Sequence, residues 1–216
     1  MIFVSNMTKK EKALEVYKRL KKAMPNPKIE LNFSNPFELL VATILSAQCT
    51  DKLVNTVTPE LFKKFPTASA MVKADVSEID HYVVKVNFHT NKAKNIKAAA
   101  QMLVEKYNGV MPKTMEELDA LPGVARKTAN VILGSAFGIA EGIVIDTHGI
   151  RLSNRLGLST SKDPVKIETE LMSMLPKEAW IDFGHLLTLH GRHICTARPH
   201  SCENCPLGDL CPEYTN

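Results

Sequence analysis

The sequence predicts an all-α protein, and three of its features support this fold class. Helix caps followed by amphipathic or apolar segments recur along the whole chain of 216 residues. Alternating apolar and polar residues, the pattern of a half-buried strand, are nearly absent. The connections between predicted helices are short. The length, together with 44% hydrophobic residues, allows a sizeable buried core.

Six helices are predicted in the first half of the chain, several of them with a recognisable N-terminal cap. Thr8 and Glu11 form a capping box, in which each side chain accepts a hydrogen bond from the other residue's backbone N–H. Asn35 precedes a proline, which favours the first position of a helix. Asn108 and Gly109 are a typical C-terminal stop. The predicted ranges are 12–24, 37–47, 52–65, 68–74, 77–86 and 92–107.

Five more helices are predicted in the second half, again bounded by caps and glycines. Thr114 and Glu117 form a second capping box, and Asp146 caps the helix that follows it. The last helix is expected to stop at Gly191. The apolar segment 141–145 is interpreted as a link between helices. The predicted ranges are 115–121, 126–137, 147–156, 165–175 and 178–190.

The composition excludes a membrane-spanning protein and predicts an intracellular one. No apolar run has the length of a membrane span. The first residues contain no long apolar segment and no small-residue cleavage site, so no signal peptide is predicted. The net charge of +4 permits a polyanionic partner without establishing one.

Four of the five cysteines lie close together near the end of the chain, spaced Cys-x6-Cys-x2-Cys-x5-Cys. A reducing compartment disfavours disulfides, whereas four thiolates can hold zinc or an iron–sulfur cluster. Zinc ribbons usually separate two cysteine pairs by about a dozen residues, so this tighter spacing favours iron–sulfur over zinc. Arg198 and His200 lie inside the loop, either as solvated charges or as phosphate contacts. The cysteines are Cys195, Cys202, Cys205 and Cys211.

A tight turn is predicted between two helices in "LPGVARKTAN", residues 121–130. Pro122 and Gly123 force the turn, and the N–H groups before the next helix point outward at the positive end of its dipole. Such a helix start binds anions, and a phosphate diester would fit it. An ordinary helix connection, or the helix-turn-helix of a transcription factor, has the same local signature.

Lys127 and Asp146 are the candidate reactive groups. Lys127 lies in the first turn of a helix, where a cation is unfavourable for the dipole. The positive helix end and burial would both favour the neutral amine, a nucleophile that forms Schiff bases. Solvation of the lysine and simple capping by Asp146 explain each residue alone. Facing one another across a cleft, they would provide a nucleophile and an electrostatic partner for a cationic intermediate.

The chain resembles endonuclease III, a family of DNA glycosylases in the helix-hairpin-helix superfamily. The resemblance covers nearly the whole chain from about Leu31 onward, and the motifs that carry it occur in the family's order. These motifs are "LLVATILSAQCTD", "LPGVARKTAN", "IDTHGIRLSNRLG" and the Cys-x6-Cys-x2-Cys-x5-Cys tail.

This resemblance implies two helical domains flanking a DNA-binding cleft. One is a six-helix domain at 29–140 that contains the helix-hairpin-helix motif. The other combines 1–28 with 141–216 and carries a C-terminal iron–sulfur loop with a [4Fe–4S] cluster. The implied partner is damaged double-stranded DNA, and we expect a cytoplasmic monomer, associated with the nucleoid through DNA and not with a membrane.

The implied activity is base-excision repair of oxidised pyrimidines in duplex DNA, by a DNA glycosylase that also cleaves the abasic site. The cleavage would proceed by β-elimination through a lysine Schiff base. A mismatch or other damaged-base glycosylase of the same superfamily is the alternative. A different class, a non-catalytic DNA-binding or zinc-stabilised regulatory module, would lack iron.

The resemblance also assigns roles position by position. Lys127 would be the nucleophile that attacks the sugar, and Asp146 the carboxylate that supports base loss. The cluster ligands would be Cys195, Cys202, Cys205 and Cys211. The DNA contacts would be the gap-filling Gln48, the wedge residue Phe88 and the hairpin amides of Gly123, Val124 and Ala125, with Asp51 in the base pocket.

The sequence departs from the family pattern at two places. Ala125 stands where the hairpin often has a second glycine, which a residue with negative φ tolerates. The wedge loop has Asn87, Phe88 and His89 in place of a Gly-Leu-Tyr type, so the preferred lesion and opposite base do not follow from the family. Phe88 has a competing interpretation as a core residue. Cys49, far from the other cysteines, is expected to be a small buried residue.

Overall fold

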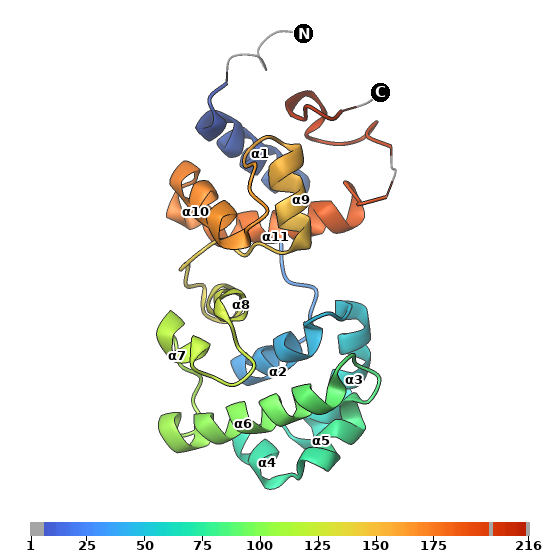
Figure 1. The fold of residues 1–216 in the computed structure, drawn as a ribbon, viewed down its shortest axis with the longest axis vertical. Helices are drawn as coiled ribbons and strands as arrows, with labels where there is room; N and C mark the ends of the chain where they lie inside the picture. The colour runs from blue at the N-terminus through green and yellow to red at the C-terminus, as the bar shows by residue number, and fades with distance from the viewer. Residues whose placement is uncertain (1–6, 199–200, 215–216) are drawn as a thin grey trace. The chain divides into compact units, whose positions relative to one another are not determined.

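The all-α prediction is confirmed. A computed structural model describes residues 7–198 and 201–214, and every regular element within these ranges is a helix (Figure 1). The chain divides into two compact units, which we call the central unit, residues 30–139, and the terminal unit, residues 1–29 with 140–216. In the described ranges, no helix is both long enough and apolar enough to cross a membrane.

The central unit contains seven helices. The sequence also predicts seven helices between residues 29 and 140, including the short ones observed at 68–73 and 115–119, whereas the resemblance implied six. The long helix α6 packs against α2, α4 and α5, as Figure 1 shows. The helices are α2 (Pro36–Ser46), α3 (Asp51–Lys64), α4 (Ala68–Lys73), α5 (Val76–Val83), α6 (His89–Tyr107), α7 (Met115–Asp119) and α8 (Arg126–Phe137).

Helix α2 is the most buried element of the central unit. Nearly all of its residues from Phe37 to Leu45 are buried, and it packs against α3, α6 and α8. A helix that is apolar all round has to be covered on all sides. The Glu38 N–H donates to Asn35 Oδ1 at 3.0 Å, which caps the helix start as predicted. The surrounding helices therefore fix the position of its C-terminal end, from which the Gln48 loop departs.

The terminal unit joins the two ends of the chain around one core. Its helix α1 packs against α10 and α11, and α9 packs against both α10 and α11. The cysteine loop adds Leu207 and Leu210 to the same apolar core as Leu20 and Phe183, so the loop is anchored by hydrophobic burial. The elements are α1 (Lys9–Ala23), α9 (Thr147–Arg155), α10 (Pro164–Met174), α11 (Trp180–His193) and the 3-10 turns η1 (Lys177–Ala179) and η2 (Gly208–Leu210).

The capping residues predicted at Thr8, Asn35 and Asp146 are confirmed, although α1 begins at Lys9, three residues before its predicted start. The capping box of α1 is confirmed, with Thr8 N–H donating to Glu11 Oε2 at 2.8 Å and Glu11 N–H donating to Thr8 Oγ1 at 3.2 Å. The segment 141–145 is a link, as expected. Helix α6 begins three residues earlier than predicted, because Phe88 adopts a left-handed conformation and accepts the Lys92 N–H at 3.1 Å.

The predicted stop at Gly191 is wrong, since α11 continues through this residue to His193. A Cβ atom on Gly191 would lie 2.7 Å from Cβ of His148 on the neighbouring helix α9. This glycine therefore allows α9 and α11 to approach closely and does not terminate the helix. The nearby Arg151 uses that proximity, because its guanidinium donates to the Gly191 carbonyl at 2.8 Å.

Gly191→Ala should destabilise the terminal unit by about 1–3 kcal/mol, because His148 cannot move without shifting α9. Thr188→Ala, on the same helix and without a predicted clash, is the matched control and should remain close to wild type. Denaturant unfolding of both variants measures the difference. Equal stability of the two variants would show that the close approach of α9 and α11 does not constrain the fold.

Candidate active site

The turn between α7 and α8 is a hairpin held by two buried side chains, Leu121 and Val124. The Val124 N–H donates to the Leu121 carbonyl at 3.0 Å, so it is already used inside the turn. Gly123 has a φ of 79°, in the left-handed region that favours glycine. Ala125 has a φ of −122°, so its side chain is tolerated as expected. This arrangement leaves the N–H groups of Gly123 and Ala125 as the hairpin's donors for an anion, with Val124 as an apolar anchor.

Lys127 is the second residue of α8 and is exposed. The first turn of this helix contains no acidic residue, and its backbone N–H groups have no acceptor within the helix. The hairpin and this turn therefore present N–H dipoles beside a lysine, an arrangement suited to a negatively charged group. The burial expected for Lys127 is not found, so exposure and the helix start are what distinguish this amine.

Gln48 and Phe88 are both exposed, and both have left-handed backbone conformations, with φ of 54° and 57°. Phe88 is 62% exposed, so the interpretation of Phe88 as a core residue is wrong. Asp51 is the first residue of α3 and is half-buried. Cys49 is also only half-buried, which corrects the expectation of a buried residue. All four belong to the central unit.

Two polar side chains tie the Gln48 loop to the start of α6. Asn87 Nδ2 donates to the Gln48 carbonyl at 2.8 Å. Lys92 Nζ donates to the carbonyls of Leu45 at 2.7 Å and Ala47 at 2.6 Å. Burial lowers the pKa of Lys92.

The sequence analysis did not single out Lys92. One signal was available, because Lys92 lies four residues before Ile96 on the buried stripe of α6. A lysine in such a stripe needs buried acceptors.

Asp146 caps α9, as predicted. Its Oδ1 accepts the Gly149 N–H at 2.8 Å, and the residue is half-buried. One carboxylate oxygen is thus engaged by the backbone, which fixes the side chain's orientation. Asp146 belongs to the terminal unit and Lys127 to the central unit, so their expected pairing stays a prediction.

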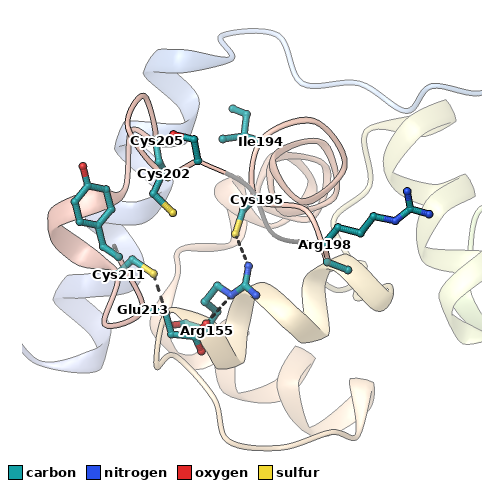
Figure 2. Close-up of a pocket in the computed structure, with 11 residues that line it drawn as sticks. Arg155, Ile194, Cys195, Arg198, Cys202, Cys205, Cys211 and Glu213 are labelled. Carbon is teal, nitrogen blue, oxygen red and sulfur yellow. Dashed lines mark hydrogen bonds and ion pairs between the residues drawn. The ribbon is translucent and has the colours of Figure 1, made fainter. Parts of the chain in front are cut away.

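The four clustered cysteines line one cavity of about 360 Å³ in the terminal unit (Figure 2). Within the described residues, no three His, Cys, Asp or Glu side chains form a set that could hold a metal ion. Burial raises the pKa of the Cys205 and Cys211 thiols, and neighbouring cysteine thiolates raise it further. Burial therefore disfavours the thiolate forms of Cys205 and Cys211.

Arginine side chains connect the cysteine loop to the helices of the terminal unit. Arg155 Nη1 donates to Cys195 Sγ at 3.0 Å, and its Nε donates to Glu213 Oε2 at 2.8 Å (Figure 2). Arg19 of α1 forms a two-point ion pair with Asp209. These contacts join both ends of the loop to helices far away in the sequence.

Arg198, the other charged group predicted in the loop, is exposed. Figure 2 shows its guanidinium pointing away from the four sulfur atoms. His200 lies outside the described residues.

Comparison with known proteins identifies the family. Residues 41–177 match the HhH-GPD superfamily of base excision DNA repair proteins. Endonuclease III of Synechocystis sp. is 49% identical over 205 residues, covering 95% of this chain and 94% of its own. Endonuclease III of Escherichia coli is 43% identical over 205 residues, covering 95% and 96%. The chain belongs to the endonuclease III family.

Solved structures agree with this membership. A non-covalent endonuclease III–DNA complex matches with a TM-score of 0.90 at 41% identity, covering 96% of this chain and 97% of its own. A trapped covalent intermediate of endonuclease III with DNA matches with a TM-score of 0.89 at 41% identity, with the same coverage. This endonuclease III family chain is accordingly a base excision repair enzyme with DNA glycosylase and abasic-site lyase activity. The non-catalytic regulatory module is thereby excluded.

Gly123→Ala should disrupt the hairpin for two separate reasons. A left-handed backbone costs alanine about 1–2 kcal/mol, and the new Cβ would lie 2.9 Å from Cβ of Asn95 on α6. Gly138→Ala is the matched control, because Gly138 has a φ of 67° and no neighbouring atom within 4 Å of such a Cβ. Thermal unfolding should show a larger loss for Gly123→Ala. Equal losses would mean that contact with Asn95 does not fix the hairpin.

Proposed function

We propose that the substrate is duplex DNA containing an oxidised pyrimidine, and that Lys127 performs both base removal and strand cleavage. The observation that carries this proposal is the exposed lysine in the first turn of α8, at a helix start whose N-cap Ala125 makes no side-chain hydrogen bond to the backbone. The enzyme acts as a monomer on chromosomal DNA in the cytoplasm. A mismatch or other damaged-base glycosylase of the same superfamily is the second candidate, because Asn87, Phe88 and His89 depart from the usual wedge loop.

The reaction begins with attack by the neutral Lys127 amine on C1′ of the damaged nucleotide. The new N–C1′ bond replaces the bond to the base, which leaves with the bonding electrons and takes up a proton. Opening of the sugar ring gives a protonated imine. Asp146 stabilises the positive charge on the sugar and assists proton transfers.

Strand cleavage follows from the same imine. The imine acidifies C2′, which loses a proton, and the electron pair forms a double bond as the C3′–O bond breaks. The 3′ phosphate leaves as the anion. Water then adds to the imine carbon, and hydrolysis releases the Lys127 amine and the unsaturated aldehyde.

The nucleotide has to leave the helix before Lys127 can reach its sugar. Gln48 and Phe88 would fill the resulting gap and wedge the opposite strand, since inserted side chains offset part of the lost stacking. Asp51, three residues after Gln48, would contact the extruded base. The hairpin N–H groups and Arg198 would contact phosphates, which position the duplex without reading its sequence.

The cysteine-lined cavity suits a [4Fe–4S] cluster held by four thiolates. The cavity brings all four together, and their Cys-x6-Cys-x2-Cys-x5-Cys spacing is tighter than that of zinc ribbons, which favours an iron–sulfur cluster over zinc. When bound, the cluster supplies iron–thiolate bonds that fix the loop. The chain's own contribution is to hold the thiolates, with Arg155 donating to Cys195 Sγ. The ligands would be Cys195, Cys202, Cys205 and Cys211.

Lys127→Gln tests the nucleophile. Glutamine is polar and of similar length but cannot form an imine, so borohydride trapping of enzyme on damaged duplex and strand cleavage should both disappear while DNA binding is retained. Asp146→Asn should still bind DNA, with turnover reduced roughly 10²–10³-fold. Mass spectrometry of the trapped wild type should locate the adduct on Lys127. An adduct on another amine, or normal trapping by Lys127→Gln, would overturn the assignment.

Cys202→Ser tests the cluster. This variant should lose iron and visible absorption, and it should unfold at a lower temperature, because the loop loses its cross-links to the terminal unit. Cys49→Ser, the one cysteine outside the loop, should keep the wild-type iron content. Stoichiometric zinc in a colourless wild-type protein would contradict the cluster, and full stability of iron-free Cys202→Ser would contradict its anchoring role.

A further inference from the structure

Gln48 and Phe88 share an unusual property that their proposed contacts with DNA do not explain. Both are non-glycine residues in left-handed backbone conformations, which are unfavourable and persist only where the surroundings fix them. Both side chains are exposed, so burial of these side chains does not hold the backbone in place. Neighbouring groups must therefore maintain the two conformations.

The hydrogen bonds around the end of α2 provide that support. Helix α2 ends at Ser46, and its last carbonyls have no partner inside the helix. Lys92 Nζ donates to two carbonyls at this end, those of Leu45 and Ala47, at 2.7 and 2.6 Å. A cation at a helix C-terminus also interacts favourably with the helix dipole. These bonds therefore fix the backbone position of Ala47, the residue directly before Gln48.

The same lysine is bonded to the other loop. The Lys92 backbone N–H donates to the Phe88 carbonyl at 3.1 Å and so begins α6. Asn87, directly before Phe88, donates from Nδ2 to the Gln48 carbonyl at 2.8 Å. Helices α2 and α6 pack together (Figure 1). The Lys92 side chain is buried between them, with 6% of the residue exposed. One hydrogen bond thus joins the two loops directly, from Asn87 to Gln48, and the two Nζ bonds of Lys92 join the start of α6 to the end of α2.

We propose that Lys92, assisted by Asn87, is a positioning residue that holds the Gln48 and Phe88 loops as one preformed unit for insertion into DNA. This inference rests on the proposed roles of Gln48 and Phe88. A preformed pair of loops does not have to be ordered when DNA binds, which strengthens binding to a duplex from which a nucleotide has been extruded. Binding to intact duplex, where nothing is inserted, does not benefit.

Lys97 provides a matched control on the same helix. Its Nζ donates to the carbonyl of Ala74, the C-cap of α4, at 2.6 Å. Lys97 therefore supports a helix end through a similar bond, but away from the Gln48 loop. Lys92→Met and Lys97→Met each remove the ammonium and keep a flexible apolar side chain, so both should lower the melting temperature.

The decisive measurement is affinity for two duplexes, one intact and one with a stable tetrahydrofuran abasic site. Lys92→Met should weaken binding to the abasic duplex roughly tenfold or more, because the variant loses the one to two hydrogen bonds that hold the loops in their inserted conformation. Its binding to intact duplex should be unchanged. Lys97→Met should bind both duplexes as wild type does. Identical binding by the two variants would overturn the proposal.

A double-mutant cycle separates positioning from general stabilisation. If Lys92 acts through Gln48, the effect of Lys92→Met on abasic-site affinity should largely vanish in a Gln48→Ala background. Additive losses would overturn the proposal. If Lys92→Met does not fold, Asn87→Ala replaces it, because Asn87 is exposed and its side chain makes one hydrogen bond to Gln48. Asn87→Ala should lose less abasic-site affinity, and this loss should also largely vanish in the Gln48→Ala background.

Failure of the underlying function would look different. A wild-type protein without preference for the abasic duplex, or a Gln48→Ala variant with unchanged preference, would refute the insertion role itself, and the positioning role with it. A different result would refute only the positioning role. In that case the wild type prefers the abasic duplex and Gln48→Ala loses this preference, but Lys92→Met binds both duplexes as Lys97→Met does.

Discussion

The backbone groups at helix ends are the constraint on which this protein depends. A chain built of short helices leaves a large share of its N–H and C=O groups without partners inside a helix, and each has to be satisfied. Thr8, Asn35 and Asp146 satisfy N–H groups at helix starts, and Lys92 and Lys97 satisfy carbonyls at helix ends. At the hairpin before α8 we propose that the N–H groups of Gly123 and Ala125 bind a phosphate. In this proposal, stability and recognition use the same kind of chemical group.

The parts of the fold that sequence predicted well are those determined locally. A capping residue and the N–H that it accepts lie two or three positions apart, so Thr8, Asn35 and Asp146 were recognisable without any knowledge of the fold. The hairpin was recognisable for the same reason, because Gly123 needs a positive φ whatever surrounds it. The family resemblance added the order of the motifs, and the comparisons confirmed the family.

The errors and omissions concern contacts between residues distant in sequence. Gly191 has the pattern of a helix stop, but its role depends on His148, which lies on another helix. From sequence alone Lys92 resembles a solvated lysine, because its acceptors at the end of α2 lie more than 40 residues away in the chain. Phe88 is exposed because its own backbone, at the N-cap of α6, is left-handed, and the type of side chain does not reveal that conformation. The joining of Asp146 to Lys127 remains a prediction because these residues belong to different units.

The discontinuity of the terminal unit has a consequence for synthesis of the chain. Helix α1 emerges from the ribosome well before its packing partners α10 and α11, which begin only at Pro164 and Trp180. At typical translation rates the apolar stripe of Ala13, Val16 and Leu20 therefore waits on the order of ten seconds for its core. The central unit, whose sequence is continuous, can fold during this interval. The cysteine loop is made after all of these helices, so the proposed cluster could not guide their folding during synthesis.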